Sequence, residues 1–77
     1  DENELQSRFE TILNDMDFLT EEDKKLTGYS LMDKIIEYRN KARAEKNWAI
    51  ADKVRTLLDG ISIVLKDSKD STIWEEK

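Results

Sequence analysis

The chain has 77 residues and a formal net charge of −5, and it contains no cysteine, no histidine, no proline and only two glycines. Without cysteine and histidine it can form no disulfide, no thiolate or imidazole metal site, and no Cys–His or Ser–His–Asp catalytic group. No stretch approaches the roughly 18 apolar residues of a membrane span, and no signal peptide is evident. The start at Asp1 rather than Met leads us to expect an excised fragment or a processed product, folded as one small domain.

The charge is distributed unevenly along the chain. Residues 1–33 carry ten acidic residues against three basic ones, a formal charge of −7, whereas residues 39–55 carry six basic residues against two acidic ones, a formal charge of +4. A basic run on an acidic chain is typical of contact with a phosphate backbone, and the acidic half would confine that contact to one face. A solvated helix face is the alternative interpretation of the same run.

The first predicted elements are helical. In residues 4–16 the apolar positions follow one another at spacings of 4, 3, 1 and 3, which puts them on one face of a helix. Residues 20–23 have the pattern of a capping box, which predicts a short helix up to Thr27 with Gly28 as its left-handed C-cap. Residues 1–29 are therefore predicted to form an N-terminal helical segment.

A pair of amphipathic helices is predicted next. Ser30 is expected to begin a helix over residues 30–46, and Asn47 is a good N-cap for a second helix over residues 47–59. Because the link between them is short, the two helices are expected to be antiparallel neighbours.

The pattern changes after Gly60. The β-branched and apolar residues at about 61–67 predict a strand, a turn-like stretch follows, and residues 72–76 predict its hairpin partner. The expected fold class is mainly α (α+β): a small helical bundle whose antiparallel helix pair is followed by a C-terminal β-hairpin.

Several stretches in the second half of the chain follow the order and spacing of a known signature, ER..AR..KdWa.AD.iRd.L...GI.L.D...GT.W. They are residues 36–43, 46–52, 54–58, 63–67 and 71–74. Through them residues 35–77 resemble the C-terminal tail of the cysteinyl-tRNA synthetases. A match across two helices and a hairpin is more specific than any single motif, whereas residues 1–34 show no such resemblance.

The sequence departs from the family pattern at a few positions. Ser62 stands where the family has the glycine that turns the chain out of the helix, and we expect Gly60 to take that turn instead. Ser71 replaces a glycine, so the hairpin tip is expected to differ. Asn47 replaces a common aspartate as an equivalent N-cap, and Thr56 stands where an acid is usual.

The resemblance implies that residues 30–77 form a C-terminal anticodon-binding domain, which recognises the GCA anticodon of cysteine tRNA. Carried over position by position, it implies four RNA-binding residues: Arg43, Trp48, Asp52 and Asp67. The basic neighbours Arg39, Lys41 and Lys46 are expected to add affinity for the RNA backbone without carrying sequence information.

These residue types suit single-stranded RNA. Anticodon bases can splay out and stack on an aromatic ring such as that of Trp48. The carboxylate of Asp52, one helical turn further on, only accepts hydrogen bonds, and guanine offers a paired N1–H and N2–H₂ donor edge. Asp67 can accept from the amino group of another base, and Arg43 can bind a phosphate or stack on a base.

Each of these residues also has a structural interpretation. In that alternative Trp48 fills the core, Asp52 pairs with a basic neighbour on a solvated helix, and Asp67 only shapes a turn. Trp74, in the tail, is expected to pack against the opposite strand rather than to contact RNA.

Two functions from different classes stay open. The first is tRNA anticodon recognition, with cysteine tRNA and the remainder of a parent synthetase as partners, no DNA and no membrane, in a cytoplasmic monomer. The second is a non-catalytic helical protein-interaction module, for which the amphipathic residues 1–19 are a candidate.

Catalysis by the chain itself is not expected, because no acid–base constellation and no nucleotide-binding loop is present. The resemblance implies that the parent enzyme, an ATP-dependent cysteine–tRNA ligase, uses ATP and zinc. For this fragment we expect no cofactor and no metal.

Overall fold

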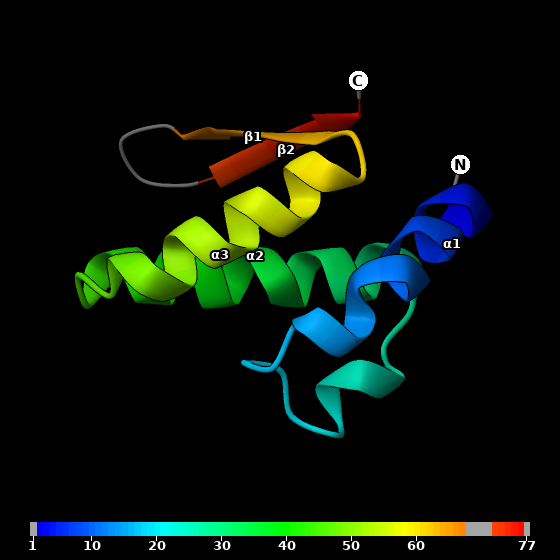
Figure 1. Cartoon of the computed structure of the whole chain (residues 1–77), viewed down its shortest axis with the longest axis horizontal. Helices are drawn as coiled ribbons and strands as arrows, with labels where there is room; N and C mark the ends of the chain where they lie inside the picture. The colour runs from blue at the N-terminus through cyan, green and yellow to red at the C-terminus, as the bar shows by residue number, and fades with distance from the viewer. Residues whose placement is uncertain (1, 68–71, 77) are drawn as a thin grey trace.

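A computed structural model describes residues 2–67 and 72–76, which form three α-helices followed by a two-stranded antiparallel hairpin. The elements run in the order α1 (Glu2–Ile12), two 3-10 turns (Leu13–Asp15 and Asp23–Lys25), α2 (Gly28–Ala44), α3 (Trp48–Gly60), β1 (Ile63–Asp67) and β2 (Thr72–Glu76). Helices α2 and α3 lie side by side, with the hairpin on one side of the pair and the N-terminal segment on the other (Figure 1). The expected fold class is confirmed.

The N-terminal segment contains less helix than its apolar spacing predicts. Helix α1 ends at Ile12 and continues only as the 3-10 turn Leu13–Asp15. The predicted capping box is confirmed, since Thr20 Oγ1 accepts from the Asp23 amide at 3.1 Å while Asp23 Oδ2 accepts from the Thr20 amide at 3.2 Å. Only one 3-10 turn follows it, because a helix of so few residues is not stable by itself.

Gly28 has the expected left-handed backbone but not the expected role. Its φ is +55°, a value that favours glycine, yet it begins α2 instead of ending a preceding helix. Its amide donates to Gln6 Oε1 at 2.8 Å, which ties the start of α2 to α1. The predicted start of this helix at Ser30 is therefore wrong, and Thr27 precedes the first residue of the helix.

A tight corner joins α2 to α3. Lys46 has a φ of +60°, and the amides of Lys46 and Asn47 donate to the carbonyls of Arg43 (3.1 Å) and Ala42 (2.7 Å). This is the Schellman arrangement, which satisfies the last carbonyls of a helix. Asn47 Oδ1 also accepts from the Ile50 amide at 3.4 Å, so the predicted N-cap of the second helix is confirmed.

The exit from α3 differs from its prediction. Gly60 is the last residue of α3 and does not have positive φ, whereas Ser62 has a φ of +67°. Ser62 therefore takes the left-handed turn that we expected at Gly60. The hairpin follows in the register Ile63↔Glu76, Leu65↔Trp74 and Asp67↔Thr72, while the tip that includes Ser71 lies outside the described residues.

The core draws on every α-helix and on strand β1. One cluster of buried apolar side chains contains Leu5, Phe9, Ile12, Met16, Leu19, Leu31, Met32, Ile35, Val54, Leu58, Ile63 and Leu65. The apolar face of residues 4–16 thus packs inside this domain and is not left open for a partner. No helix in the described part of the chain is both long enough and apolar enough to cross a membrane.

Candidate functional site

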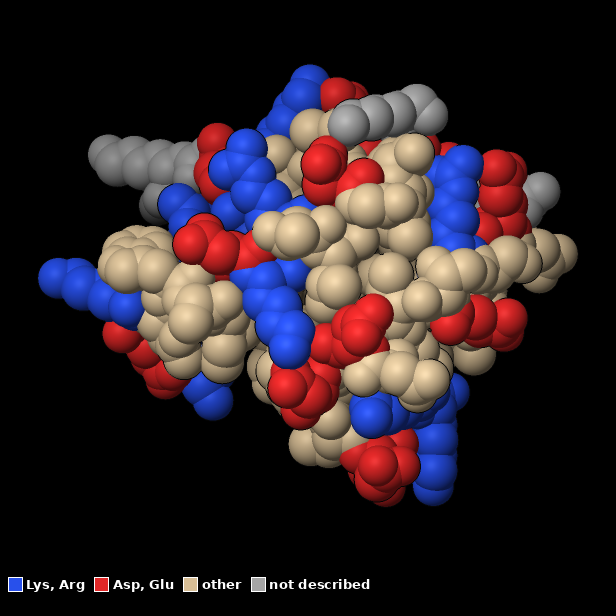
Figure 2. Space-filling model, in the orientation of Figure 1, with Lys and Arg blue, Asp and Glu red and all other residues tan. Residues whose placement is uncertain are grey.

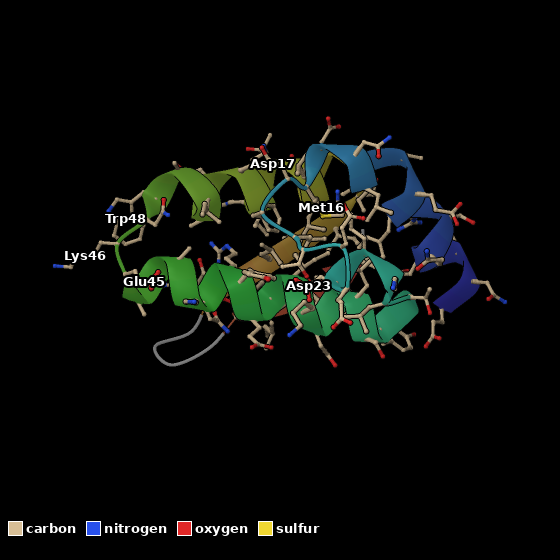
Figure 3. All side chains as sticks on the ribbon, turned by 90° about the horizontal axis from the view of Figure 1, so that it is seen from below. Met16, Asp17, Asp23, Glu45, Lys46 and Trp48 are labelled. Atoms are coloured by element: carbon tan, nitrogen blue, oxygen red, sulfur yellow. The ribbon has the colours of Figure 1, made fainter. Side chains whose placement is uncertain are left out.

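Trp48 is the first residue of α3 and its side chain faces solvent. It is 56% exposed, which makes it one of the few large hydrophobic residues on the surface. The alternative in which this ring fills the core is therefore wrong. Figure 3 shows Trp48, Lys46 and Glu45 together at the corner between α2 and α3, away from the N-terminal segment. An indole fixed at a helix start and open to water can stack on a base.

Asp52 lies one helical turn after Trp48 and is also exposed. Within residues 2–67 and 72–76, neither a hydrogen bond nor an ion pair to its carboxylate is found, so the alternative in which Asp52 pairs with a basic neighbour is not supported. Lys53, the next residue, pairs instead with Asp17 at 2.8 Å. The oxygens of Asp52 therefore remain available to accept hydrogen bonds from a ligand.

Arg39 and Asp67, which are 28 residues apart, form a two-pronged ion pair. Arg39 Nη1 donates to Asp67 Oδ1, and Nη2 donates to Oδ2 at 3.0 Å. The Arg39 side chain is only 6% exposed, whereas that of Asp67 is 32% exposed. A paired fork of this kind is the strongest arrangement for an arginine and a carboxylate. It joins the end of β1 to the middle of α2.

Thr72 and Asn40 complete this cluster. The buried Thr72 hydroxyl accepts from Arg39 Nη1 at 3.0 Å and has Asn40 Oδ1 (2.8 Å) and Asp67 Oδ1 (3.1 Å) as possible acceptors for its proton. The hydrogen bond from Arg39 is the main cause that lowers the pKa of Asp67 below its ordinary value, and burial opposes it. Asp67 is therefore ionised at neutral pH.

Arg43 stands next to this cluster on the following turn of α2. Its Nη1 lies 3.3 Å from Asp67 Oδ1, and its side chain is 34% exposed. Asp67 thus contacts two guanidinium groups, of which that of Arg39 is buried and that of Arg43 is partly open to solvent. In Figure 1 the end of β1 and the corner between α2 and α3 lie at the same end of the molecule.

The fold divides the basic run between two sides of α2. Arg39 and Arg43 point toward the hairpin, because both contact Asp67. Lys41 lines the other side with Tyr38, whose hydroxyl is bound to Asp23 of the N-terminal segment. Lys46 is exposed at the corner. The predicted basic patch is thus two separate groups, and only one of them adjoins Asp67.

The face seen in Figure 2 has no broad region of one charge sign, because Lys and Arg side chains alternate there with Asp and Glu. Two small cavities lie along α2, of about 80 and 120 Å³. The larger is lined by Tyr38, Lys41, Ala42, Glu45, Asn47 and Ile50. The face seen in Figure 2 thus offers local contacts and no wide field of one sign.

Sequence reasoning missed Thr72 and Asn40. Thr72 is part of the signature, but nothing in its local sequence shows that its hydroxyl meets Arg39, which is 33 residues earlier. Trp74 is half-buried, packs on the core and lies 6.1 Å from Tyr29 between ring centroids. Its predicted packing role is thus supported.

Comparison with known proteins adds a family relationship. No protein-family model matches the chain, and no solved structure does. The chain is 50% identical over 44 residues to a cysteine--tRNA ligase of Fusobacterium nucleatum, covering 57% of the chain and 9% of that protein. It is 37% identical over 54 residues to the cysteine--tRNA ligase of Coxiella burnetii, and this match covers 70% of the chain and 12% of that protein. The chain thus spans about a tenth of the length of the curated relatives it matches.

Proposed function

Because the chain belongs to the cysteine--tRNA ligase family, we propose that its residues 30–77 form an anticodon-binding module that recognises the GCA anticodon of cysteine tRNA. The remaining residues, 1–29, form the helical segment that precedes the module. The parent enzyme would be an ATP-dependent ligase of the cytoplasm, and the partners of this chain would be that tRNA and the rest of the ligase. The chain acts as a monomer and binds no DNA.

The observation that carries the proposal is the side chain of Trp48. The residue is 56% exposed at the start of α3, within the part of the sequence that resembles the C-terminal tail of the ligases. Stacking of a splayed base on such a ring is worth roughly 1–3 kcal/mol. An indole at the start of a helix and open to solvent offers a flat surface on which a base can stack.

Asp52 supplies base selection in this proposal. Its carboxylate accepts hydrogen bonds and donates none, so it suits the paired N1–H and N2–H₂ edge of guanine, the first base of the GCA anticodon. Arg43, Lys41 and Lys46 supply contacts to the phosphate backbone. Arg39 and Asp67 belong to the same region.

Catalysis lies outside this proposal. The chain has no cysteine and no histidine, so its residues do not fit a thiolate or imidazole zinc site such as the family implies. Among the described residues there is also no group of three or more side chains that could hold a metal ion. ATP and zinc are therefore proposed only for the parts of the parent ligase that this chain does not include.

The test is an NMR titration of the chain with a GCA anticodon stem-loop and with a loop of different sequence. The two indole N–H signals provide an internal comparison, since Trp48 is exposed and Trp74 is packed on the core. We expect the Trp48 signal to shift strongly with the GCA loop and weakly with the other loop. A Trp48 signal that neither loop moves at low salt would overturn the proposal.

Two matched variants test the base assignment. Asp52→Asn should reduce the preference for guanine at the first anticodon position, because an amide donates where the carboxylate accepted. Asp33→Asn, which removes an exposed acid from the other end of α2, should leave that preference unchanged. Equal preference in the wild type and in Asp52→Asn would assign guanine recognition to another residue.

A further inference from the structure

Most of the acceptor capacity of Asp67 is used within the fold. Its Oδ1 is contacted by Arg39 Nη1, by Arg43 Nη1 and by the Thr72 hydroxyl, and its Oδ2 accepts from Arg39 Nη2. A carboxylate oxygen has two lone pairs, so Oδ1 has no room for a further donor. Oδ2 keeps one further acceptor site, but the main contacts of Asp67 are those to the two arginines.

Burying the guanidinium of Arg39 costs free energy that attachment of the hairpin alone does not require. Its guanidinium is buried, and its Nε has no hydrogen-bond partner among the described residues. Replacing a buried ion pair by apolar residues of similar volume is often neutral or stabilising. Stability alone therefore does not explain an arginine at this position, whereas a requirement for a fixed carboxylate does.

Arg43 is the outermost member of the cluster. The two guanidinium groups and the single carboxylate leave one net positive charge, and Arg43 is the cation that reaches solvent. One of its nitrogens faces Asp67, and its other donors have no hydrogen bond to residues 2–67 or 72–76, so they can meet a phosphate. Because Asp67 already holds the guanidinium of Arg43, this side chain loses less conformational entropy when it binds a phosphate.

From this geometry we propose that Arg39 and Asp67 are positioning residues that hold the guanidinium of Arg43 against a phosphate of the bound RNA. We call the series of contacts from Arg39 through Asp67 to Arg43 the relay. Thr72, which is hydrogen-bonded to Asn40, holds the guanidinium of Arg39 in place. Within this cluster of Arg39, Arg43, Asp67 and Thr72, only Arg43 contacts the RNA. The inference rests on the proposed function, because it concerns how the same site binds the anticodon loop.

The direction in which Asp67→Asn changes the affinity for RNA separates this proposal from simple electrostatics. Asp67→Asn removes a negative charge, which by itself should strengthen binding to a polyanion. If Asp67 orients Arg43, the same substitution should instead weaken binding to the GCA stem-loop several-fold. Glu75→Gln is the matched control, since it removes a carboxylate of the same hairpin that pairs with Lys66 at 2.7 Å. That variant should bind slightly more tightly or unchanged.

The decisive experiment is a double-mutant cycle on stem-loop affinity, measured over a range of salt concentrations. Arg43→Gln should lower the slope of log K against log salt by about 1, the value for one lost phosphate contact. In that background Asp67→Asn should no longer weaken binding, and only the small strengthening from the lost negative charge should remain. A persistent effect of Asp67→Asn, combined with altered base preference, would overturn the relay and make Asp67 a base reader.

A second measurement needs no RNA and therefore separates failure of the relay from failure of the proposed function. The Nε–Hε signal of Arg43 should report an ordered side chain in the wild type and a mobile one in Asp67→Asn and in Arg39→Met. Arg39→Met keeps the volume at position 39, and its fold can be checked by amide dispersion. Equal mobility of Arg43 in all three proteins would overturn the relay, even if the wild type binds the GCA loop.

Discussion

The hydroxyl of Tyr38 donates a hydrogen bond to Asp23 Oδ2, 15 residues earlier in the chain, at 2.5 Å. This contact holds the N-terminal segment against α2. On the other helix of the pair, Lys53 of α3 binds Asp17 of the same segment. Figure 3 shows Asp17 beside α3 and Asp23 beside α2, so the segment spans the helix pair. The ring of Phe18, between the two acids in sequence, meets Tyr38 edge-on with centroids 5.8 Å apart.

Tyr38→Phe tests the contribution of that hydrogen bond. The variant keeps the aromatic contact with Phe18 and loses only the hydroxyl, so we expect the free energy of unfolding to fall by about 1 kcal/mol. Urea denaturation measures the change. Tyr29→Phe is the control, because Tyr29 is 48% exposed, and it should change stability by less than about 0.5 kcal/mol. Equal effects of the two variants would show that the Asp23 contact contributes nothing.

Ser62→Gly should stabilise the chain. Ser62 has a φ of +67°, a conformation that costs a residue with a Cβ atom roughly 1 kcal/mol and costs glycine little. We expect the melting temperature to rise by several degrees, as is typical of about 1 kcal/mol in a small domain.

Gly60→Ala is the companion of that variant. A Cβ atom at position 60 would meet no atom within 4 Å, and its φ is not positive. Alanine there should be neutral or stabilising by up to about 1 kcal/mol, because it restricts the unfolded chain. If Gly60→Ala destabilised the chain and Ser62→Gly did not stabilise it, Gly60 rather than Ser62 would be the turning residue in solution.

Asp67→Asn should alter how stability depends on pH. The pKa of Asp67 in the folded chain is lowered, chiefly by Arg39, from an ordinary value of 3.8. Its ion pairs therefore contribute fully to the free energy of unfolding above about pH 4, and this contribution is lost as the pH falls through the lowered pKa. The wild type should thus lose stability in acid more steeply than Asp67→Asn does.

Urea midpoints between pH 7 and pH 2 check this expectation. The variant should keep some acid sensitivity, because the pKa values of Asp17 and Asp23 are also lowered, by Lys53 and by Tyr38 respectively. Parallel pH profiles of the wild type and the variant would mean that Asp67 has the same pKa folded and unfolded.

The two tryptophans should respond differently to truncation. Trp48→Ala removes an exposed ring and should change the free energy of unfolding by less than about 0.5 kcal/mol. Trp74→Ala removes a half-buried ring that packs on the core and near Tyr29, and it should cost about 2 kcal/mol. Thermal unfolding followed by circular dichroism compares them. A large loss of stability in Trp48→Ala would mean that the ring packs in solution.

Local signals along the chain were enough to predict most of the architecture. The capping box at residues 20–23, the N-cap at Asn47 and the helix pair depend on groups within about four residues of one another, and these predictions are confirmed. The start of α2 and the turn at Ser62 were predicted two residues away from where they occur. In both places a glycine and a polar residue compete for the same role, and local propensity does not decide between them.

For the candidate site, the order of residues along the chain and the family signature predicted a set of RNA-binding residues, and that set stays a prediction. The contacts of Arg39 with Thr72 and Asp67 were not predicted. Only the tertiary structure decided that Trp48 and Asp52 face solvent while Arg39 is buried against Asp67. The physical reason is that the Arg39–Asp67 pair closes across 28 residues, and such a contact forms only when the hairpin packs on α2. Whether a charged side chain meets RNA or another side chain depends on that packing.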